Sequence, residues 1–359
     1  MPVDMRIAGH SIAADAPMFV IAELGLNHNG DRDLALRLVD AAAAAGASAV
    51  KLQAFHADRL VAEQPSILAH VDSTSLRDLF RSFELDAEAC RDVVARARSH
   101  GLAVVVTAFD EDMVRECVAL GIDALKIASG DLTHVALIEA AARTGLPVLL
   151  STGMSVDADV ANALDWAVGA GARVVAVLHC VSAYPTPDDQ QNLRAIQTLA
   201  RTCRLPVGLS DHGMGRDAAI IACALGATVY ERHFHLPGTD AIDAAVSSSP
   251  DELREIVESV ARTRRALGDG RRRPVAAEVP NIHASRRGLY ATRTLAAGHV
   301  VTEDDVCALR PANGLGAQFH RSLVGCRIAR TIGAGAAFET RDLMAPQACY
   351  QGEEVARGA

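Results

Sequence analysis

The sequence has few aromatic residues and no long apolar run. Aromatic side chains make up 4% of its 359 residues, whereas half of the residues are apolar. No stretch approaches the ~20 apolar residues of a membrane-spanning helix, and the N-terminus has neither the basic nor the apolar region of a secretory signal. We therefore expect a cytoplasmic α/β protein that is rich in Ala, Val and Leu and has no membrane partner.

An excess of positive charge and paired cysteine motifs are also absent. The formal net charge is −9 with a pI near 5.8, which argues against a nucleic-acid partner. The eight cysteines are scattered and lack CxxC spacing, so we expect reduced thiols. The length favours a large domain with a smaller one. Small molecules are the expected partners.

Eight short apolar runs alternate with helix-length, Ala-rich segments, several of which end at glycine. No G-x-G-x-x-G follows the first run, which disfavours the alternative of an open, doubly wound sheet. Eight β/α units predict a closed (β/α)8 barrel, or TIM barrel. The runs are FVIAEL (19–24), ASAVKLQ (47–53), LAVVVTAF (102–109), DALKIAS (123–129), LPVLLST (146–152), RVVAVLHC (173–180), LPVGLSD (205–211) and ATVYERH (227–233).

Polar residues end nearly every run. In barrels of this class the active site gathers at the carboxyl ends of the strands, so these endings predict a polar pocket at the barrel mouth. They are Glu23, Lys51, Gln53, Thr107, Lys126, Ser129, Ser151, His179, Ser182, Ser210, His212, Glu231 and His233.

The chain changes character near residue 270. We expect the barrel in residues 1–270, a basic, Pro-containing linker in 271–285 and a small second domain in 286–350, followed by a tail, 351–359. The second domain has short β-like runs and glycine turns but no obvious chemistry of its own.

The motifs IAELGLNHNGD, AVKLQAF, LKIASGD, LLSTGM, LHCVSAYPTP, GLSDHGMG, ERHFHL and RRGLYATRTLAAGHVVTEDDVCALRP resemble, in this order, those of the sialic acid synthase family. The resemblance covers nearly the whole chain. It implies a TIM barrel followed by an antifreeze-like (SAF) domain. It also implies the condensation of phosphoenolpyruvate with N-acetylmannosamine or a related sugar aldehyde, which yields a nonulosonic acid and phosphate.

His212 and His233 end adjacent predicted strands, so their imidazoles can converge on one ion. Nitrogen and oxygen ligands with open positions suit Mn²⁺ as a Lewis acid, with Mg²⁺ and Co²⁺ as alternatives. The competing interpretation is that a histidine at a barrel mouth only hydrogen-bonds a neighbour. Family members usually have Thr at position 235, so His235 is left out of the metal set.

Lys51 and Lys126 lie inside apolar runs, where an unpaired charge is costly, and we expect a bound anion to compensate them. Cations and hydroxyl donors are what a phosphate monoester requires. The resemblance implies that the phosphate and carboxylate of phosphoenolpyruvate bind here. The expected hydroxyl donors are Thr107, Ser129, Ser151, Ser182 and Ser210.

Glu23 has two interpretations: it handles the proton of a reacting water, or it is a structural partner of Lys51. In the implied reaction, C3 of phosphoenolpyruvate attacks a metal-polarised aldehyde, water adds at C2, and phosphate leaves by C–O cleavage. Glu23 would orient or deprotonate that water.

On the acceptor side, Asp243 matches a family aspartate that binds acceptor hydroxyls, and Tyr184 and Gln53 are further candidates. The chain departs from the family pattern here, because Asp131 stands where Glu is general and His134 where Asn is frequent. Arg232 likewise replaces Lys. The reaction class is therefore better defined than the acceptor.

The family's second domain caps the barrel of a dimer partner, with an arginine on the acceptor's N-acyl group. The resemblance implies a domain-swapped homodimer with Arg310 of LRPANG in this role; the alternative is an ordinary loop arginine. Two other functions stay open: an octulosonate- or heptulosonate-type synthase, and a catalytically silent sugar- or phosphate-binding paralogue.

Overall fold

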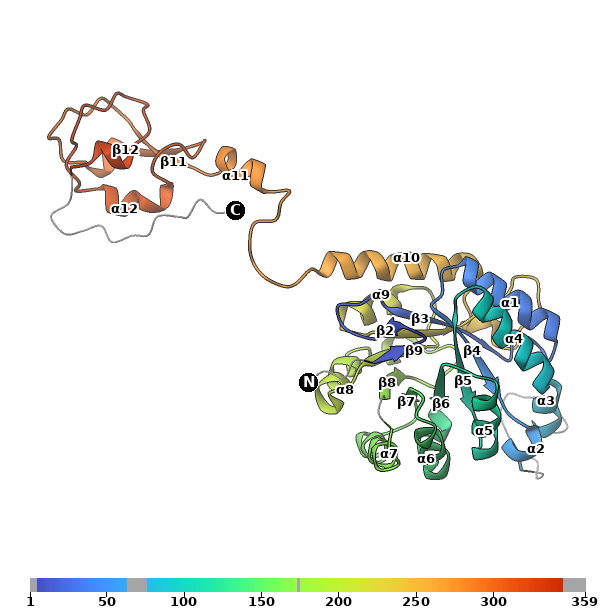
Figure 1. The fold of residues 1–359 in the computed structure, drawn as a ribbon. Helices are drawn as coiled ribbons and strands as arrows, with labels where there is room; N and C mark the ends of the chain where they lie inside the picture. The colour runs from blue at the N-terminus through green and yellow to red at the C-terminus, as the bar shows by residue number, and fades with distance from the viewer. Residues whose placement is uncertain (1–4, 63–75, 173–174, 345–359) are drawn as a thin grey trace. The chain divides into compact units, whose positions relative to one another are not determined.

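The computed structural model describes residues 5–62, 76–172 and 175–344. The chain divides into two compact units, Met1–Asp269 and Gly270–Ala359, each with its own apolar core. In the first unit, helices surround a central set of strands (Figure 1). None of the helices in the described ranges is both long and apolar enough to cross a bilayer.

Eight parallel strands of the first unit close into a barrel, which confirms the predicted fold. Each strand coincides with one of the apolar runs, and β10 pairs with β3 to close the ring. Their residues are buried almost throughout, as expected where helices cover a parallel sheet. The strands are β3 (Phe19–Gly25), β4 (Ala49–Ala54), β5 (Ala103–Ala108), β6 (Ala124–Ile127), β7 (Val148–Ser151), β8 (Val175–Cys180), β9 (Val207–Asp211) and β10 (Val229–His233).

Capping residues define where several of the helices begin. Asp31 accepts hydrogen bonds from the backbone N–H groups of Asp33 and Leu34 at the start of α1. Ser249 and Glu252 form a reciprocal capping box at the start of α10. These contacts satisfy N–H groups that have no partner inside the helix. The helices of this unit are α1 (Arg32–Ala44), α2 (Ala57–Leu60), α3 (Leu76–Ser82), α4 (Ala87–Ser99), α5 (Glu111–Ala119), α6 (Val135–Arg143), α7 (Asp157–Gly169), α8 (Ala195–Cys203), α9 (Asp217–Ala224) and α10 (Pro250–Leu267).

Apolar side chains fill the barrel interior. An N-terminal hairpin, β1 (Arg6–Ile7) and β2 (His10–Ser11), adds Ile7 to this filling. Ile7 belongs to the same buried cluster as Phe19 and Ile21, which lie on β3. The polar side chains at the carboxyl ends of the strands are therefore the ones left to line a binding pocket.

The second unit contains α11 (Val279–Ser285), the antiparallel pair β11 (Gly288–Ala291) and β12 (Val306–Leu309), and α12 (His320–Leu323). The expected linker, 271–285, contains helix α11, and its role as a linker stays a prediction. Residues 345–350 of the expected second domain and the expected tail, 351–359, lie outside the described residues. The identity of the second unit as an antifreeze-like (SAF) domain stays a prediction.

An internal repeat organises the second unit. The stretch RTLAAGHVVTEDDV begins at Arg293, and the similar stretch RTIGAGAAFETRDL begins at Arg330. The aspartates near their ends, Asp305 and Asp342, are both buried, and each accepts a hydrogen bond from the Nε of the arginine that opens its own stretch. The repeated Asp–Arg contact ties the two ends of each stretch together.

Candidate active site

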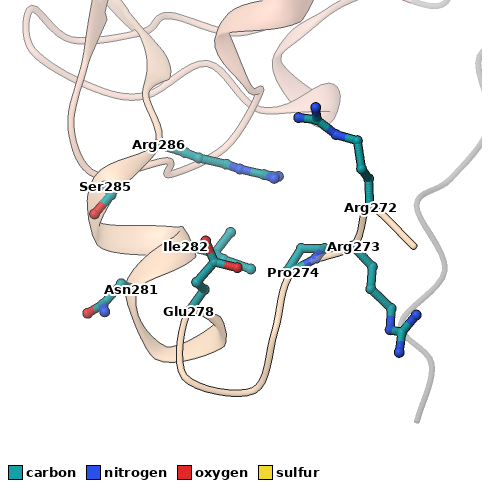
Figure 2. A pocket seen from close by; sticks show the side chains of 8 residues that line it. All are labelled: Arg272, Arg273, Pro274, Glu278, Asn281, Ile282, Ser285 and Arg286. Carbon is teal, nitrogen blue, oxygen red and sulfur yellow. The ribbon is translucent and has the colours of Figure 1, made fainter. Parts of the chain in front are cut away.

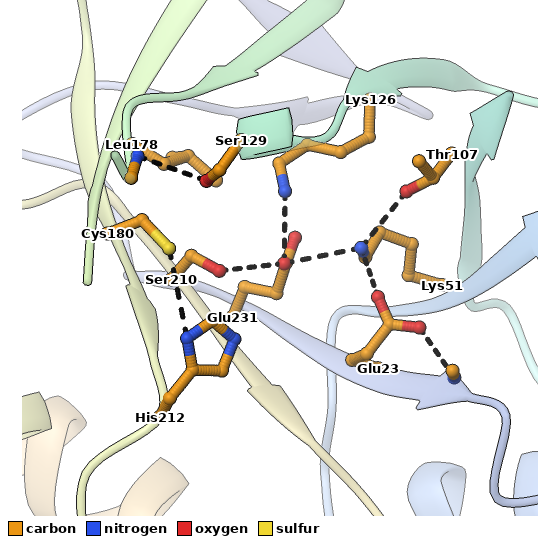
Figure 3. A network of polar contacts seen from close by, with 12 residues as sticks. Glu23, Lys51, Thr107, Lys126, Ser129, Leu178, Cys180, Ser210, His212 and Glu231 are labelled. Atoms are coloured by element: carbon orange, nitrogen blue, oxygen red, sulfur yellow. Dashed lines mark hydrogen bonds and ion pairs between the residues drawn. The ribbon is translucent and has the colours of Figure 1, made fainter. Parts of the chain in front are cut away.

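A buried carboxylate, Glu231, contacts both predicted lysines at the barrel mouth (Figure 3). Lys126 Nζ and Ser210 Oγ donate hydrogen bonds to Glu231 Oε1 over 3.1 and 3.0 Å, and Lys51 Nζ lies 3.3 Å from the same oxygen. Burial alone would raise the pKa of Glu231, but the charges of Lys126 and Lys51 outweigh burial and hold it well below its usual range. Glu231 is therefore an ionised group at the centre of the pocket.

Lys51 has a second carboxylate partner in Glu23. Its Nζ forms an ion pair with Glu23 Oε2 and donates to Thr107 Oγ1 over 3.1 Å. Burial lowers the pKa of Lys51, but Glu23 and Glu231 outweigh burial and raise it above its usual value. Glu23 and Glu231 therefore compensate the buried charge of Lys51 without a bound anion, a pairing that the sequence did not predict. Glu23 makes the contact that its structural interpretation requires, and its catalytic role stays a prediction.

Two predicted hydroxyls converge over Gly153, in the turn after β7. Gly153 N donates to Ser129 Oγ over 3.0 Å. A Cβ placed on Gly153 would lie 2.3 Å from Ser182 Oγ and 2.8 Å from Ser129 Oγ. Nearby in the chain, Ser151 Oγ is buried and has no hydrogen-bond partner within the described ranges. Ser129, Ser182 and Ser151 therefore have donor capacity to offer an anion.

His212 and His233 lie together, with their ring centroids 5.4 Å apart. The ring of Tyr184 lies 4.1 Å from that of His212 and 5.9 Å from that of His233. His212 follows β9 and His233 ends β10, and these strands are hydrogen-bonded neighbours. The predicted pair is thus one cluster beside the lysine and glutamate network.

The Nδ1 atom of each imidazole lies close to an oxygen of the protein. His212 Nδ1 lies 2.9 Å from the Val181 carbonyl oxygen, which can only accept, so this nitrogen carries the proton. His233 Nδ1 lies 3.2 Å from Asp243 Oδ2. The proton on Nδ1 leaves the Nε2 lone pair of His212 for a ligand, as metal-binding histidines commonly have, whereas His233 Nδ1 has no hydrogen-bond partner among the described residues.

The donor set suits a metal ion with an open coordination shell. In the parts of the chain that the structure describes, no group of three His, Cys, Asp or Glu side chains could hold a metal. Two imidazoles would need water or substrate oxygens to complete a shell, as in catalytic sites that bind substrate directly. Two imidazoles and no third protein ligand are thus present among the described residues, and the metal site stays a prediction.

A buried ion pair is formed by the residues that precede the two histidines in the chain. Asp211 Oδ2 accepts hydrogen bonds from Arg232 over 2.9 Å and from Tyr230 over 2.7 Å, and Asp211 and Arg232 are cross-strand neighbours. Each of the charged residues immediately precedes one of the histidines in the chain. The pair therefore links β9 to β10 where the histidines emerge.

Two predicted substrate-binding residues of the first unit make no described contact with the lysine and glutamate network, and a third lies on the second unit. Gln53 lines a cavity of about 300 Å³ between α4 and α5. Asp131 is half-buried on η1 (Ser129–Asp131), and burial raises its pKa although the charge of His134 opposes this. Arg310 is exposed on the second unit, directly after β12.

Another hollow, of about 640 Å³, lies on the second unit (Figure 2). None of the predicted site residues lines it. Its walls come from the expected linker, helix α11 and the residue after α11, namely Arg272, Arg273, Pro274, Glu278, Asn281, Ile282, Ser285 and Arg286. We do not assign it to the site.

Glu231 was noted in the sequence as a polar strand ending, without a role. The sequence does contain a signal for this role: an acidic residue lies inside one apolar run, and lysines that need a partner lie inside two others. Gly153 received no role either, because a glycine gives no sign of which side chains approach it. Contacts between residues far apart in the chain decide both roles.

Fold and site together define a (β/α)8-barrel enzyme with a buried cluster of lysines and glutamates beside a histidine pair. The chain belongs to the NeuB family, whose model matches residues 38–272. It is 36% identical over 331 residues to N,N'-diacetyllegionaminic acid synthase from Legionella pneumophila, with 88% of this chain and 92% of that protein covered. The resemblance to sialic acid synthases is thereby confirmed.

Solved structures agree with this assignment. N-acetylneuraminic acid synthetase from Leptospira borgpetersenii, in complex with citrate, is 34% identical with a TM-score of 0.68, covering 75% of this chain and 91% of that one. The spore coat polysaccharide biosynthesis protein SpsE from Bacillus subtilis is 32% identical with a TM-score of 0.65, covering 96% and 99%. The similarity to SpsE extends over almost the whole length of both chains.

Proposed function

We propose that this protein is a nonulosonic acid synthase that condenses phosphoenolpyruvate with N-acetylmannosamine or a related amino-sugar aldehyde and releases phosphate. The observation that carries the proposal is the pair of buried lysines facing hydroxyl donors. Lys51 and Lys126 are the only lysines in the sequence; the other 33 of its 35 Lys and Arg residues are arginines. The names of the related synthases support the same reaction class.

In this proposal, Lys126 and Lys51 bind the phosphate and carboxylate of phosphoenolpyruvate, and Thr107, Ser129, Ser151, Ser182 and Ser210 donate hydrogen bonds. Binding of the anion requires the lysines to share their charge between substrate and Glu231, because the ligand-free cluster already has two carboxylates for two cations. This competition favours a substrate of high negative charge over a singly charged one.

The bond changes occur on the substrates. C3 of phosphoenolpyruvate attacks the aldehyde carbon, positive charge develops at C2, water adds there, and phosphate leaves by C–O cleavage. Glu23 orients or deprotonates the water, while its ion pair with Lys51 holds the carboxylate in place. His212 and His233 would hold a divalent ion, Mn²⁺ in preference to Mg²⁺ or Co²⁺, which supplies Lewis-acid polarisation of the aldehyde oxygen. Asp243, Tyr184, Gln53 and Asp131 serve the acceptor.

A phosphate-release assay with phosphoenolpyruvate and a panel of aldoses tests the function. We expect turnover with N-acetylmannosamine or a diacetamido-trideoxyhexose, and loss of turnover on chelation or in His212→Ala and His233→Ala. Turnover only with phosphorylated aldoses would indicate an octulosonate- or heptulosonate-type synthase. Binding without turnover would indicate a silent paralogue, and full activity after exhaustive chelation would exclude the metal role.

For the second unit, we propose an antifreeze-like domain that caps the barrel of the partner in a cytoplasmic, domain-swapped homodimer through Arg310. Mixing His212→Ala with Arg310→Ala subunits tests this, since a mixed dimer would contain one wild-type site. Random mixing should restore about a quarter of the wild-type sites. No recovery despite demonstrated subunit exchange would contradict capping in trans.

A further inference from the structure

The loop after β3 carries an asparagine whose side chain is completely buried. Asn27, in GLNHNG, is 0% exposed. Its Nδ2 donates to the Phe234 carbonyl oxygen over 3.0 Å and lies 2.9 Å from Ser247 Oγ. Its Oδ1 accepts a hydrogen bond from the backbone N–H of Asp243 over 3.1 Å. Both ends of the amide are therefore committed to the segment that follows β10.

These contacts act on one loop, residues 234–247, at its two ends and near Asp243. Ser247 Oγ donates to the Asp243 carbonyl oxygen over 2.8 Å, so Asn27 and Ser247 together hold both backbone polar groups of Asp243. The contacts join residues more than 200 positions apart in the chain. Asn27 thereby joins the loop that follows β3 to the loop that follows β10.

The carboxylate of Asp243 faces the histidine pair. Asp243 Oδ2 lies 3.2 Å from His233 Nδ1. A side chain whose own backbone is clamped on both polar groups has little freedom to shift its carboxylate. Displacement of the Asp243 backbone would move this carboxylate relative to His233 and to any acceptor bound beside it.

We propose that Asn27 is a positioning residue for Asp243, through which it sets the affinity for the sugar acceptor. The proposal rests on the proposed function, in which Asp243 binds acceptor hydroxyls. Asn27 itself touches neither the lysines nor the hydroxyls of the phosphate side in the described contacts. Its effect should therefore be confined to one of the two substrates.

Steady-state kinetics with both substrates tests this role. Asn27→Ala should raise the KM for the acceptor about tenfold while the KM for phosphoenolpyruvate changes less than about twofold. The double variant Asn27→Ala/Asp243→Ala should be no worse than Asp243→Ala alone, because Asn27 acts through Asp243. Additive losses in the double variant would overturn the inference.

Thr228→Val is the matched control. Thr228 Oγ1 donates a buried hydrogen bond to the Val207 carbonyl oxygen, 3.0 Å away, just before β10 begins and thus at the far end of that strand. This variant should lower the thermal unfolding temperature by a similar amount and leave both KM values unchanged. Equal effects of Asn27→Ala on the two substrates would mean a merely structural role.

Ser247→Ala provides a milder variant if Asn27→Ala does not fold. It removes the hydroxyl that joins Asn27 to the Asp243 carbonyl, and it should raise the acceptor KM in the same direction by a smaller factor. An unchanged acceptor KM would overturn the inference. If Asp243→Ala itself leaves the acceptor KM unchanged, the proposed role of Asp243 fails and this inference with it.

Discussion

The strands and the loops of the barrel mouth hold their polar side chains in different ways. Lys51, Thr107, Lys126 and Ser210 lie on strands and are at most 4% exposed. The register of the barrel fixes their separation; Thr107, for example, is the direct neighbour of Lys126 on the adjacent strand. Tyr184 lies on a loop and is 55% exposed. Side chains on strands inherit their geometry from the sheet, whereas those on loops depend on individual long-range contacts.

The difference indicates which part of the site can vary. A change in a strand residue disturbs the buried network of two lysines and two glutamates, in which every charge has a partner. A change in a loop residue, such as Asp131, alters a half-buried group with few constraints. In this chain, Asp131 and His134 depart from the family pattern outside the strands and Arg232 departs from it on β10, while the strand lysines Lys51 and Lys126 are retained.

The largest effect is expected for Lys126→Ala. The substitution removes a cation from the phosphate side and leaves Glu231 with one lysine instead of two. Removal of one partner from a buried pair should reduce kcat/KM for phosphoenolpyruvate by about 100-fold or more. Kinetics with both substrates checks this, and equal increases in the two KM values would contradict the division of the site into two sides.

The strand side is also the part that could be predicted from the sequence. The eight apolar runs coincide with the eight barrel strands, and their polar endings gather at one mouth, because the period of a parallel barrel leaves few alternatives. The lysine partners could not be deduced in the same way. Glu231 contacts Lys126 across 105 positions of sequence, and only the closed ring brings them together.

The loop side shows what the pattern could not predict. The motif GLNHNG was recognised, yet nothing in it indicates that Asn27 clamps the backbone of Asp243. The repeat in the second unit is visible in the sequence, but its structural role follows only from the burial of Asp305 and Asp342. Periodicity identifies elements, whereas single hydrogen bonds between distant loops leave no period.

Gly153→Ala adds one methyl group and should affect the binding of phosphoenolpyruvate without affecting that of the acceptor. Gly153 has no left-handed backbone conformation, so alanine is permitted there, but its Cβ would collide with Ser182 Oγ and Ser129 Oγ. We expect the KM for phosphoenolpyruvate to rise about tenfold, with the acceptor KM nearly unchanged. Gly130→Ala is the matched control, since a Cβ there meets nothing within 4 Å. Indistinguishable kinetics of the two variants would argue against phosphate binding by Ser129 and Ser182 over Gly153.

We expect pH to have a moderate effect on kcat/KM for phosphoenolpyruvate. Burial lowers the pKa of Lys126, and the nearby Lys51 adds to this, although Glu231 opposes it. Because only the protonated lysine attracts the anion, kcat/KM for phosphoenolpyruvate should fall with rising pH before the ordinary lysine pKa of about 10.4 is reached. Lys126→Arg stays charged over this range and should lose this alkaline decline. An unchanged decline in that variant would assign it to another group.

The smallest effect is expected for Asp131→Glu, on the loop side. Asp131 is half-buried on η1 close to His134, and the longer side chain would carry the carboxylate about one bond further from the backbone. A gained or lost hydrogen bond to an acceptor hydroxyl should change the ratio of kcat/KM between two acceptor sugars by roughly 2- to 10-fold. The KM for phosphoenolpyruvate should not change, because the contacts of Lys126 and Lys51 do not include Asp131. Competition between N-acetylmannosamine and a diacetamido-trideoxyhexose measures the ratio directly. An unaltered ratio, with the phosphoenolpyruvate KM raised instead, would mean that Asp131 contacts phosphoenolpyruvate and that strands and loops do not serve separate substrates.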